Sequence, residues 1–185
     1  MEATDILKKE RRAIESVLDS LEKASQAVKG GRQVPAWVFA DGLDFIRSFA
    51  DRCHHGKEEG RLLPLLGERG LPAHSRPIQM MLIEHEEGRK YVRQAAAGYE
   101  KWIAGDAEAG AAMADALQSY IELLRGHIYK EDNILYPMGD GLITPEDDRL
   151  LVKQFDEVEE KEMGPGLHEK YHEMIEKLEQ ETARL

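Results

Sequence analysis

The chain has 185 residues, of which 42% are hydrophobic and 33% charged, with a formal net charge of -11. This length suits one domain with a sizeable core, and the acidic excess argues against nucleic acid or an acidic membrane surface as a partner. No apolar run approaches the roughly eighteen residues that would span a bilayer, and the N-terminus lacks an apolar signal core. We expect a single cytoplasmic domain over residues 1–185. The single cysteine, Cys53, agrees with a reducing compartment and is expected to be a small buried side chain.

The first half of the chain predicts two amphipathic helices. Apolar residues recur at helical spacing over residues 4–29, and Gly30 and Gly31 end that helix. Pro35 suits the first turn of a second helix, which continues to about Leu66 through the sequence HHGKEE. Helix-favouring residues dominate both segments, which indicates an all-α protein.

The second half predicts further helices with recognisable ends. A third helix covers residues 75–104, with Ser75 as its N-cap, and a fourth runs from Asp106 toward Pro137. Residues 144–147, TPED, are typical of a capping box that opens another helix, and the break GPG at 164–166 precedes a last one. Short connections favour an up-down-up-down four-helix bundle over about 4–138, with a C-terminal helical extension, 145–183, packed on it.

One motif occurs twice. His54 lies one helical turn before Glu58, and His127 lies one turn before Glu131, so the same His-x-x-x-Glu phrase recurs in both halves of the chain. Residues at i and i+4 lie on one face of a helix, so each pair presents an imidazole and a carboxylate to the same point. The repeat predicts that helices one and two are a duplicated partner of helices three and four.

Two such pairs inside a bundle predict a metal centre. Buried carboxylates repel one another and lose hydration, which a divalent ion compensates. Imidazole with carboxylate suits iron, manganese or zinc, and bridging carboxylates favour two ions. His85 is a candidate third ligand, whereas the equivalent position of the first helix carries Arg11.

The sequences HHGKEE, LLPLL, IEHEEGR, HIYKED, ILYPM and LHEKYH together resemble the hemerythrin-like HHE cation-binding proteins. That resemblance implies a four-helix bundle with a non-haem di-iron site. It implies metal ligands at five positions, with Glu58 and Glu131 as bridges: His54, Glu58, His85, His127 and Glu131.

Arg11 departs from the family pattern, because relatives commonly have histidine near this position and a guanidinium has no lone pair to donate. We expect His168 as the substitute ligand, with His172 and Glu10 as weaker alternatives. A site in which none of them binds would be mononuclear, asymmetric or inactive. His55, rotated by roughly 100° from His54, is expected to face solvent or to lie behind the ligands.

Neighbouring carboxylates are candidates for a supporting role. Glu59 and Asp132 follow the two motif glutamates directly, so we expect them to orient ligands from behind.

The resemblance implies binding or sensing of O₂, NO or peroxide at the iron. Two other classes stay open: an enzyme that consumes peroxide or NO or repairs iron-sulfur clusters, and iron storage or a scaffold with a degenerate site. The sequence alone does not separate carrier, sensor and enzyme, and it does not predict the oligomeric state.

Overall fold

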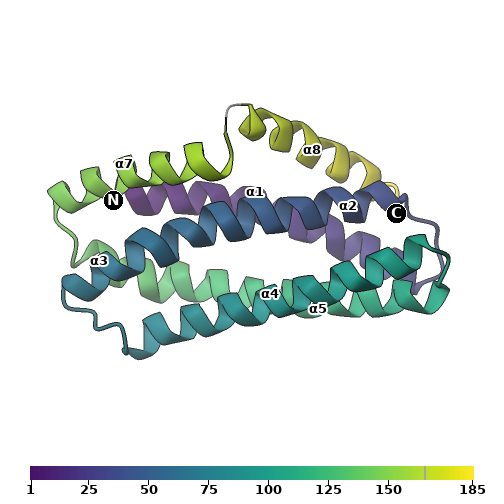
Figure 1. Cartoon of the computed structure of the whole chain (residues 1–185), viewed down its shortest axis with the longest axis horizontal. Coiled ribbons are helices and arrows are strands. Elements are labelled where there is room, and N and C mark those ends of the chain that lie inside the picture. Colours follow the sequence, from purple (N-terminus) through teal and green to yellow (C-terminus); the bar gives the residue numbers. More distant parts are fainter. Residues whose placement is uncertain (165) are drawn as a thin grey trace.

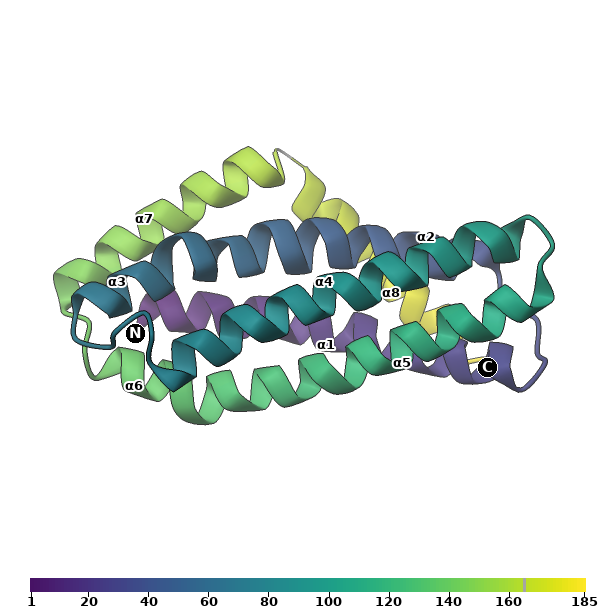
Figure 2. The same cartoon turned by 60° about the horizontal axis from the view of Figure 1, so that its bottom comes forward.

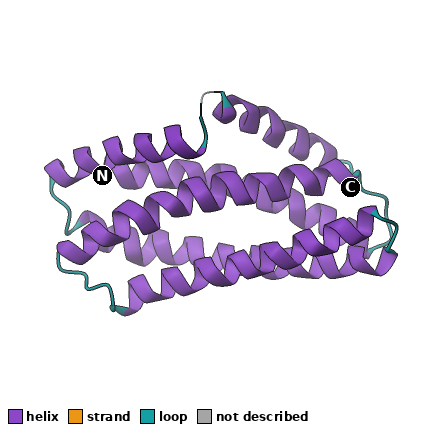
Figure 3. Ribbon diagram, viewed as in Figure 1, coloured by secondary structure: helices purple, strands orange, loops and turns teal. Residues whose placement is uncertain are grey.

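The computed structural model describes residues 1–164 and 166–185, and the side chain of His168 lies outside the described part. Within those ranges all regular structure is helical, as Figure 3 shows. None of the described helices combines the length and apolarity that crossing a bilayer requires. The predicted all-α class is confirmed.

Four antiparallel rods form the bundle, and two further helices follow along one side (Figure 1). The first rod is α1 (Glu2–Lys29), and the third is α4 (Arg76–Ile103). The second rod consists of α2 (Ala36–Phe45), η1 (Ile46–His55), η2 (Glu58–Leu62) and α3 (Leu63–Glu68), and the fourth consists of α5 (Ala107–Lys130), η3 (Glu131–Leu135) and α6 (Tyr136–Asp140). The two further helices are α7 (Pro145–Glu162) and α8 (Leu167–Thr182).

The C-terminal helices cover α1 rather than extending away from it. Helix α7 contacts α1 and both π-helical segments of the second rod, while α8 contacts α1 and α2. Figure 1 shows the two helices at an angle to each other along one side of the bundle, with α4 and α5 on the opposite side, and in Figure 2 α8 passes behind the second rod. The C-terminal helices therefore pack onto the bundle, as predicted.

Two predicted helix starts are confirmed and one is wrong in detail. Asp106 accepts hydrogen bonds from the backbone of Glu108 and Ala109 at the start of α5. Thr144 and Asp147 form the predicted capping box of α7. Ser75 occupies the N-cap position of α4, but its side chain makes no capping hydrogen bond.

The second and fourth rods are not continuous α-helices, which corrects the prediction for residues 35–66 and 106–137. Segments η1, η2 and η3 are π-helical. A π-helical turn closes through i to i+5 hydrogen bonds, so it holds about one residue more than an α-helical turn. The angle about the helix axis between consecutive side chains is consequently smaller than in an α-helix. The α-helical spacing used in the sequence analysis therefore does not predict which face of these segments a residue occupies.

Two apolar clusters fill the bundle. Between them lies a layer of buried polar side chains, here called the polar layer, which includes Glu58, His85 and Glu131. The larger cluster contains Leu18, Phe45 and Leu117, and the other, nearer α3 and α6, contains Leu7, Leu66 and Phe155. Burying large side chains such as these contributes roughly 1.5–3 kcal/mol each. The polar layer is thus enclosed by apolar packing on both sides.

Helices α4 and α5 approach closely at Gly98. A Cβ atom there would lie 2.9–3.0 Å from backbone and Cβ atoms of Met113, so Gly98→Ala requires the helices to separate. We expect Gly98→Ala to lower the free energy of unfolding by about 1–3 kcal/mol, measured by urea denaturation.

A second glycine provides the control for that measurement. Gly126 is exposed within α5 and has no heavy atom near its hypothetical Cβ. Gly126→Ala should therefore raise the free energy of unfolding by about 0.5–1 kcal/mol. Equal effects of the two substitutions would contradict the close approach.

Candidate metal centre

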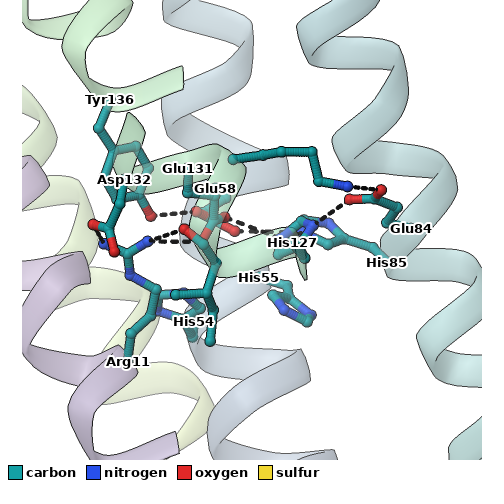
Figure 4. Close-up of polar contacts among 12 residues, drawn as sticks. Arg11, His54, His55, Glu58, Glu84, His85, His127, Glu131, Asp132 and Tyr136 are labelled. Atoms are coloured by element: carbon teal, nitrogen blue, oxygen red, sulfur yellow. Dashed lines mark hydrogen bonds and ion pairs between the residues drawn. The ribbon is translucent and has the colours of Figure 1, made fainter. Parts of the chain in front are cut away.

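The polar layer gathers the repeated motif from opposite rods. His54 and Glu58 come from the second rod, His127 and Glu131 come from the fourth, and all four side chains are at most 2% exposed. His85 joins them from α4, as Figure 4 shows. Five of the predicted ligand residues are thereby brought together inside the bundle.

The two motif carboxylates each use one oxygen within the protein. The Tyr136 hydroxyl donates to Oε1 of Glu58 at 2.6 Å, and Arg11 donates to Oε2 of Glu131 at 3.0 Å. The other oxygens, Oε2 of Glu58 and Oε1 of Glu131, are buried and accept no hydrogen bond from the described residues. Buried oxygens without a donor are costly, which favours a cation beside them.

These unsatisfied oxygens lie next to two imidazoles. Nε2 of His127 is 3.0 Å from Oε1 of Glu131, without hydrogen-bond alignment, and Nε2 of His85 is 3.5 Å from Oε2 of Glu58. The two Nε2 atoms are themselves 3.0 Å apart. Two ring nitrogens at this separation require a shared proton or a metal ion between them.

Carboxylates hold the far side of each ring. Nδ1 of His54 donates to Glu10 at 2.8 Å. Nδ1 of His85 donates to Glu59 at 2.7 Å, and Nδ1 of His127 donates to Glu84 at 2.9 Å. Because an ionised carboxylate only accepts, each ring carries its proton on Nδ1 and turns the Nε2 lone pair inward.

A lysine or arginine side chain forms an ion pair with each of these three carboxylates, called the outer carboxylates because they contact the histidines from outside the centre. Lys57 pairs with Glu10 and Lys130 pairs with Glu84, while Arg89 pairs with Glu59 at 2.7 Å. This arrangement keeps the outer carboxylates ionised despite their partial burial. Glu59 thus has the orienting contact expected from the sequence, whereas the roles of Glu10 and Glu84 were missed.

Charge and burial set the pKa values of the inner groups. Burial opposes ionisation of Glu58, but His54 and His85 hold its pKa well below the usual value. Burial and the Glu58 charge raise the pKa of Glu131. Burial opposes protonation of His127, yet Glu131 and Glu84 raise its pKa to about 10. Without metal, the His127 ring is therefore protonated, and this proton occupies the region in which a metal ion would bind.

For His55, the expectation that it faces solvent is wrong. It is 5% exposed rather than facing solvent, and its ring stacks on that of His85 with centroids 4.0 Å apart. Burial and nearby imidazoles lower its pKa well below the usual value, so the ring is neutral. The π-helical path of η1 brings adjacent His54 and His55 both inward, which α-helical spacing did not predict.

Arg11 lies inside the layer, 2% exposed. Besides Glu131, its guanidinium contacts Asp132 at 2.5 Å and the ring of Tyr136 at 4.6 Å from the centroid. Asp132 therefore supports Arg11 rather than a histidine. The arginine fills the place that the duplication assigns to a counterpart of His85.

The three residues expected as substitute ligands differ in their positions. The side chain of His168 lies outside the described residues, so its role stays a prediction. His172 is exposed on α8 and lines a cavity together with Glu10 and Glu159, but it belongs to none of the candidate metal-binding groups found among the described residues. Glu10 is occupied by His54 and Lys57, so it is an orienting carboxylate in this structure.

Two overlapping groups of described residues have the geometry to hold a metal ion. One is His55, Glu58, His85 and His127; the other is His54, Glu58 and Glu131, each with donor atoms within 4.8 Å of one another. Glu58 belongs to both. The orphaned Oε2 of Glu58 and the inward lone pairs of His85 and His127 fit a metal in the first group. The second group contains the other orphaned oxygen, Oε1 of Glu131, but Arg11 contacts that same carboxylate.

A third group, Glu10, Cys53 and Glu159, is already served by a cation. The Lys57 ammonium contacts Glu10 and lies 3.0 Å from Glu159. Burial raises the pKa of Cys53 to about 12, so the thiol stays protonated. The expectation that Cys53 is a small buried side chain agrees with its burial.

The profile of the hemerythrin HHE cation binding domain matches residues 2–139. The chain belongs to this family. A hemerythrin HHE domain is a metal-binding helical domain, in agreement with the clustered histidines and glutamates of the polar layer.

Curated relatives are more distant. The "Uncharacterized protein Rv1995" of Mycobacterium tuberculosis and the "Uncharacterized protein Mb2018" of Mycobacterium bovis are each 21% identical over 162 residues, which is 88% of this chain. The match covers 63% of each relative, so this chain spans less than two thirds of their length. No solved structure matches the chain.

Proposed function

We propose that the chain is a non-haem iron protein that binds or senses O₂, NO or peroxide. The observation that carries the proposal is the pair of Nε2 atoms of His85 and His127, 3.0 Å apart and beside the unsatisfied oxygen of Glu58. Both rings are oriented from behind by carboxylates, an arrangement typical of metal-ligating histidines.

The donor types favour iron. Imidazole and carboxylate without thiolate suit iron and manganese better than a structural zinc site. We assign the principal ion to His55, Glu58, His85 and His127. Reduced iron would supply an electron and an open coordination position for a small oxidant.

A small cavity adjoins this group. It has a volume of about 150 Å³, and its lining includes His55, His85 and His127 together with Ile46, Val92, Tyr120 and Leu124. A space of this size accommodates a diatomic molecule or peroxide, and the apolar side chains share its wall with charged ones such as Asp51 and Arg89. This favours small-ligand binding over storage of a mineral core.

Arg89 closes part of the same cavity. It donates to Asp51 at 2.9 Å and to Glu59 at 2.7 Å, and so links η1 to η2 across the face of α4. The ion pairs keep the cavity wall in place and hold Glu59 against His85. The chain thus orients its ligands and restricts solvent through one connected set of contacts.

The proposal is tested by iron content and optical spectra of anaerobically purified protein, before and after addition of NO or O₂. We expect wild type to hold iron and to change its spectrum with NO. His85→Ala should lose at least about tenfold in iron affinity. His74→Ala, in an exposed loop, should not.

Absence of iron from wild type, or spectra that NO leaves unchanged, would contradict the proposal. Catalytic consumption of peroxide or NO would assign the same centre to an enzyme instead of a carrier or sensor. His168→Ala tests the predicted substitute ligand, since an unchanged iron content would exclude it.

A further inference from the structure

We infer that Arg11 takes the place of a second metal ion, so that each chain holds one ion and folds without it. The inference rests on the proposed metal centre and specifies its composition. It follows from a comparison of the two halves of the polar layer, which the duplication makes equivalent.

The halves correspond residue by residue. Glu10 matches Glu84, His54 matches His127, and Lys57 matches Lys130, in the same order along the chain. Each trio makes the same contacts, from the lysine through the glutamate to Nδ1 of the histidine. This correspondence locates the position at which the halves differ.

Arg11 is the counterpart of His85, because each directly follows the orienting glutamate of its half, Glu10 or Glu84. Glu59 contacts His85, and Asp132, which follows the other motif glutamate, contacts Arg11. The arginine is therefore held as a ligand histidine is held in the other half. Its guanidinium, however, brings a positive charge and no lone pair.

The oxygens of the motif carboxylates divide accordingly. Donors from Tyr136 and Arg11 occupy Oε1 of Glu58 and Oε2 of Glu131. The oxygens without hydrogen bonds are those beside His85 and His127. One half thus offers an ion carboxylate oxygens that accept no hydrogen bond. The other half already has a cation and a hydroxyl beside its carboxylate oxygens.

The charge of Arg11 has two consequences. It repels a second divalent ion from the group His54, Glu58 and Glu131, because like charges at contact range in a buried site interact strongly. It also compensates Glu131 and Asp132 when no metal is present. A centre with two ions has no such permanent compensation in its metal-free form.

Metal stoichiometry is the first test. After anaerobic loading with iron(II) and removal of loosely bound metal, wild type should hold one ion per chain. Arg11→His restores a lone pair and should raise the content to two. Arg12→His, one position along α1 and exposed, should leave it at one.

Stability of the metal-free protein is the second test. In the presence of a chelator, Arg11→Gln should lower Tm by roughly 10 °C, because it leaves the buried carboxylate of Glu131 without its compensating charge. Arg11→Lys retains the charge and should recover most of the loss. Arg12→Gln should change Tm by less than about 2 °C.

The outcomes separate the two proposals. Two ions in wild type, or one in Arg11→His, would overturn the inference while leaving the metal centre intact. No ion in either protein would contradict the proposed function itself. An Arg11→Gln protein as stable as wild type without metal would overturn the compensating role of Arg11.

Discussion

Replacing Glu58 by glutamine is expected to reduce iron affinity by more than about 100-fold, a larger loss than that typical of an orienting residue. Glu58 belongs to both overlapping groups of candidate ligands, so neither of these two ion positions is independent of it. The amide keeps an oxygen to accept from Tyr136 but replaces the charged oxygen beside His85 with a neutral group. Metal analysis and competition with a chelator measure the effect.

The same substitution should lower the stability of the metal-free fold without unfolding it. His54 and His85 hold the pKa of Glu58 well below its usual value, so the ionised carboxylate stabilises the folded protein at neutral pH. Glu58→Gln removes that stabilisation, and the loss is partly offset because the repulsion that raises the pKa of Glu131 is removed too. We therefore expect a Tm with chelator below that of wild type but above the temperature of the metal assay, so metal loss would not reflect unfolding.

Glu59→Gln is the matched control for Glu58→Gln. Glu59 contacts Nδ1 of His85 and not the inner face of the centre, so its replacement should cost roughly 10- to 100-fold in iron affinity. If Glu58→Gln binds iron as well as Glu59→Gln does, the assignment of Glu58 as the shared ligand is wrong.

Replacing Lys57 by methionine is expected to lower the free energy of unfolding by about 3–5 kcal/mol. The ammonium is fully buried, contacts Glu10 and lies 3.0 Å from Glu159 of α7. Although burial opposes its charge, Glu10 keeps the pKa of Lys57 raised. Methionine fills the space but leaves the Glu10 carboxylate with His54 as its remaining polar contact.

Lys130→Met provides the control, because Lys130 has the equivalent position in the other half. Its side chain is 32% exposed, whereas Lys57 is fully buried, so the pair of Lys130 and Glu84 lies closer to solvent and contributes less to stability. We expect a loss of about 1 kcal/mol or less. Equal losses for the two lysines in urea denaturation would contradict the burial argument.

A double-mutant cycle isolates the pair. Glu10→Gln removes the charge that Lys57 compensates, so the double variant should lose less stability than the sum of the two single variants. The expected coupling is about 1–3 kcal/mol. Additive losses would show that Lys57 stabilises the fold through packing alone.

Local pattern was sufficient for the helices and for the repeated motif. Apolar spacing, Asp106 and the Thr144 capping box predicted helix starts that depend on neighbouring residues only. The recurrence of His54 and Glu58 as His127 and Glu131 predicted that both pairs would meet in the bundle. The second and fourth rods of an up-down-up-down bundle run in the same direction, so equivalent positions of the two halves lie at the same level.

Contacts between residues far apart in the chain account for the site residues that the sequence did not predict. Tyr136 donates to a glutamate 78 residues away, and Glu84 orients a histidine 43 residues away. No spacing rule relates such positions before the rods are packed. The expectation that His55 could face solvent was wrong because the face of a side chain depends on whether the helix is α or π, and tertiary packing decides that locally.

The sequence by itself determined the helical class, the duplicated ligand pairs and the absence of a ligand at Arg11, because these follow from residue chemistry and helical periodicity. The tertiary structure decided which oxygens stay free, which cation serves each outer carboxylate and what Arg11 contacts. Those properties arise from the enclosed polar layer, where each buried charge must find a partner on another rod.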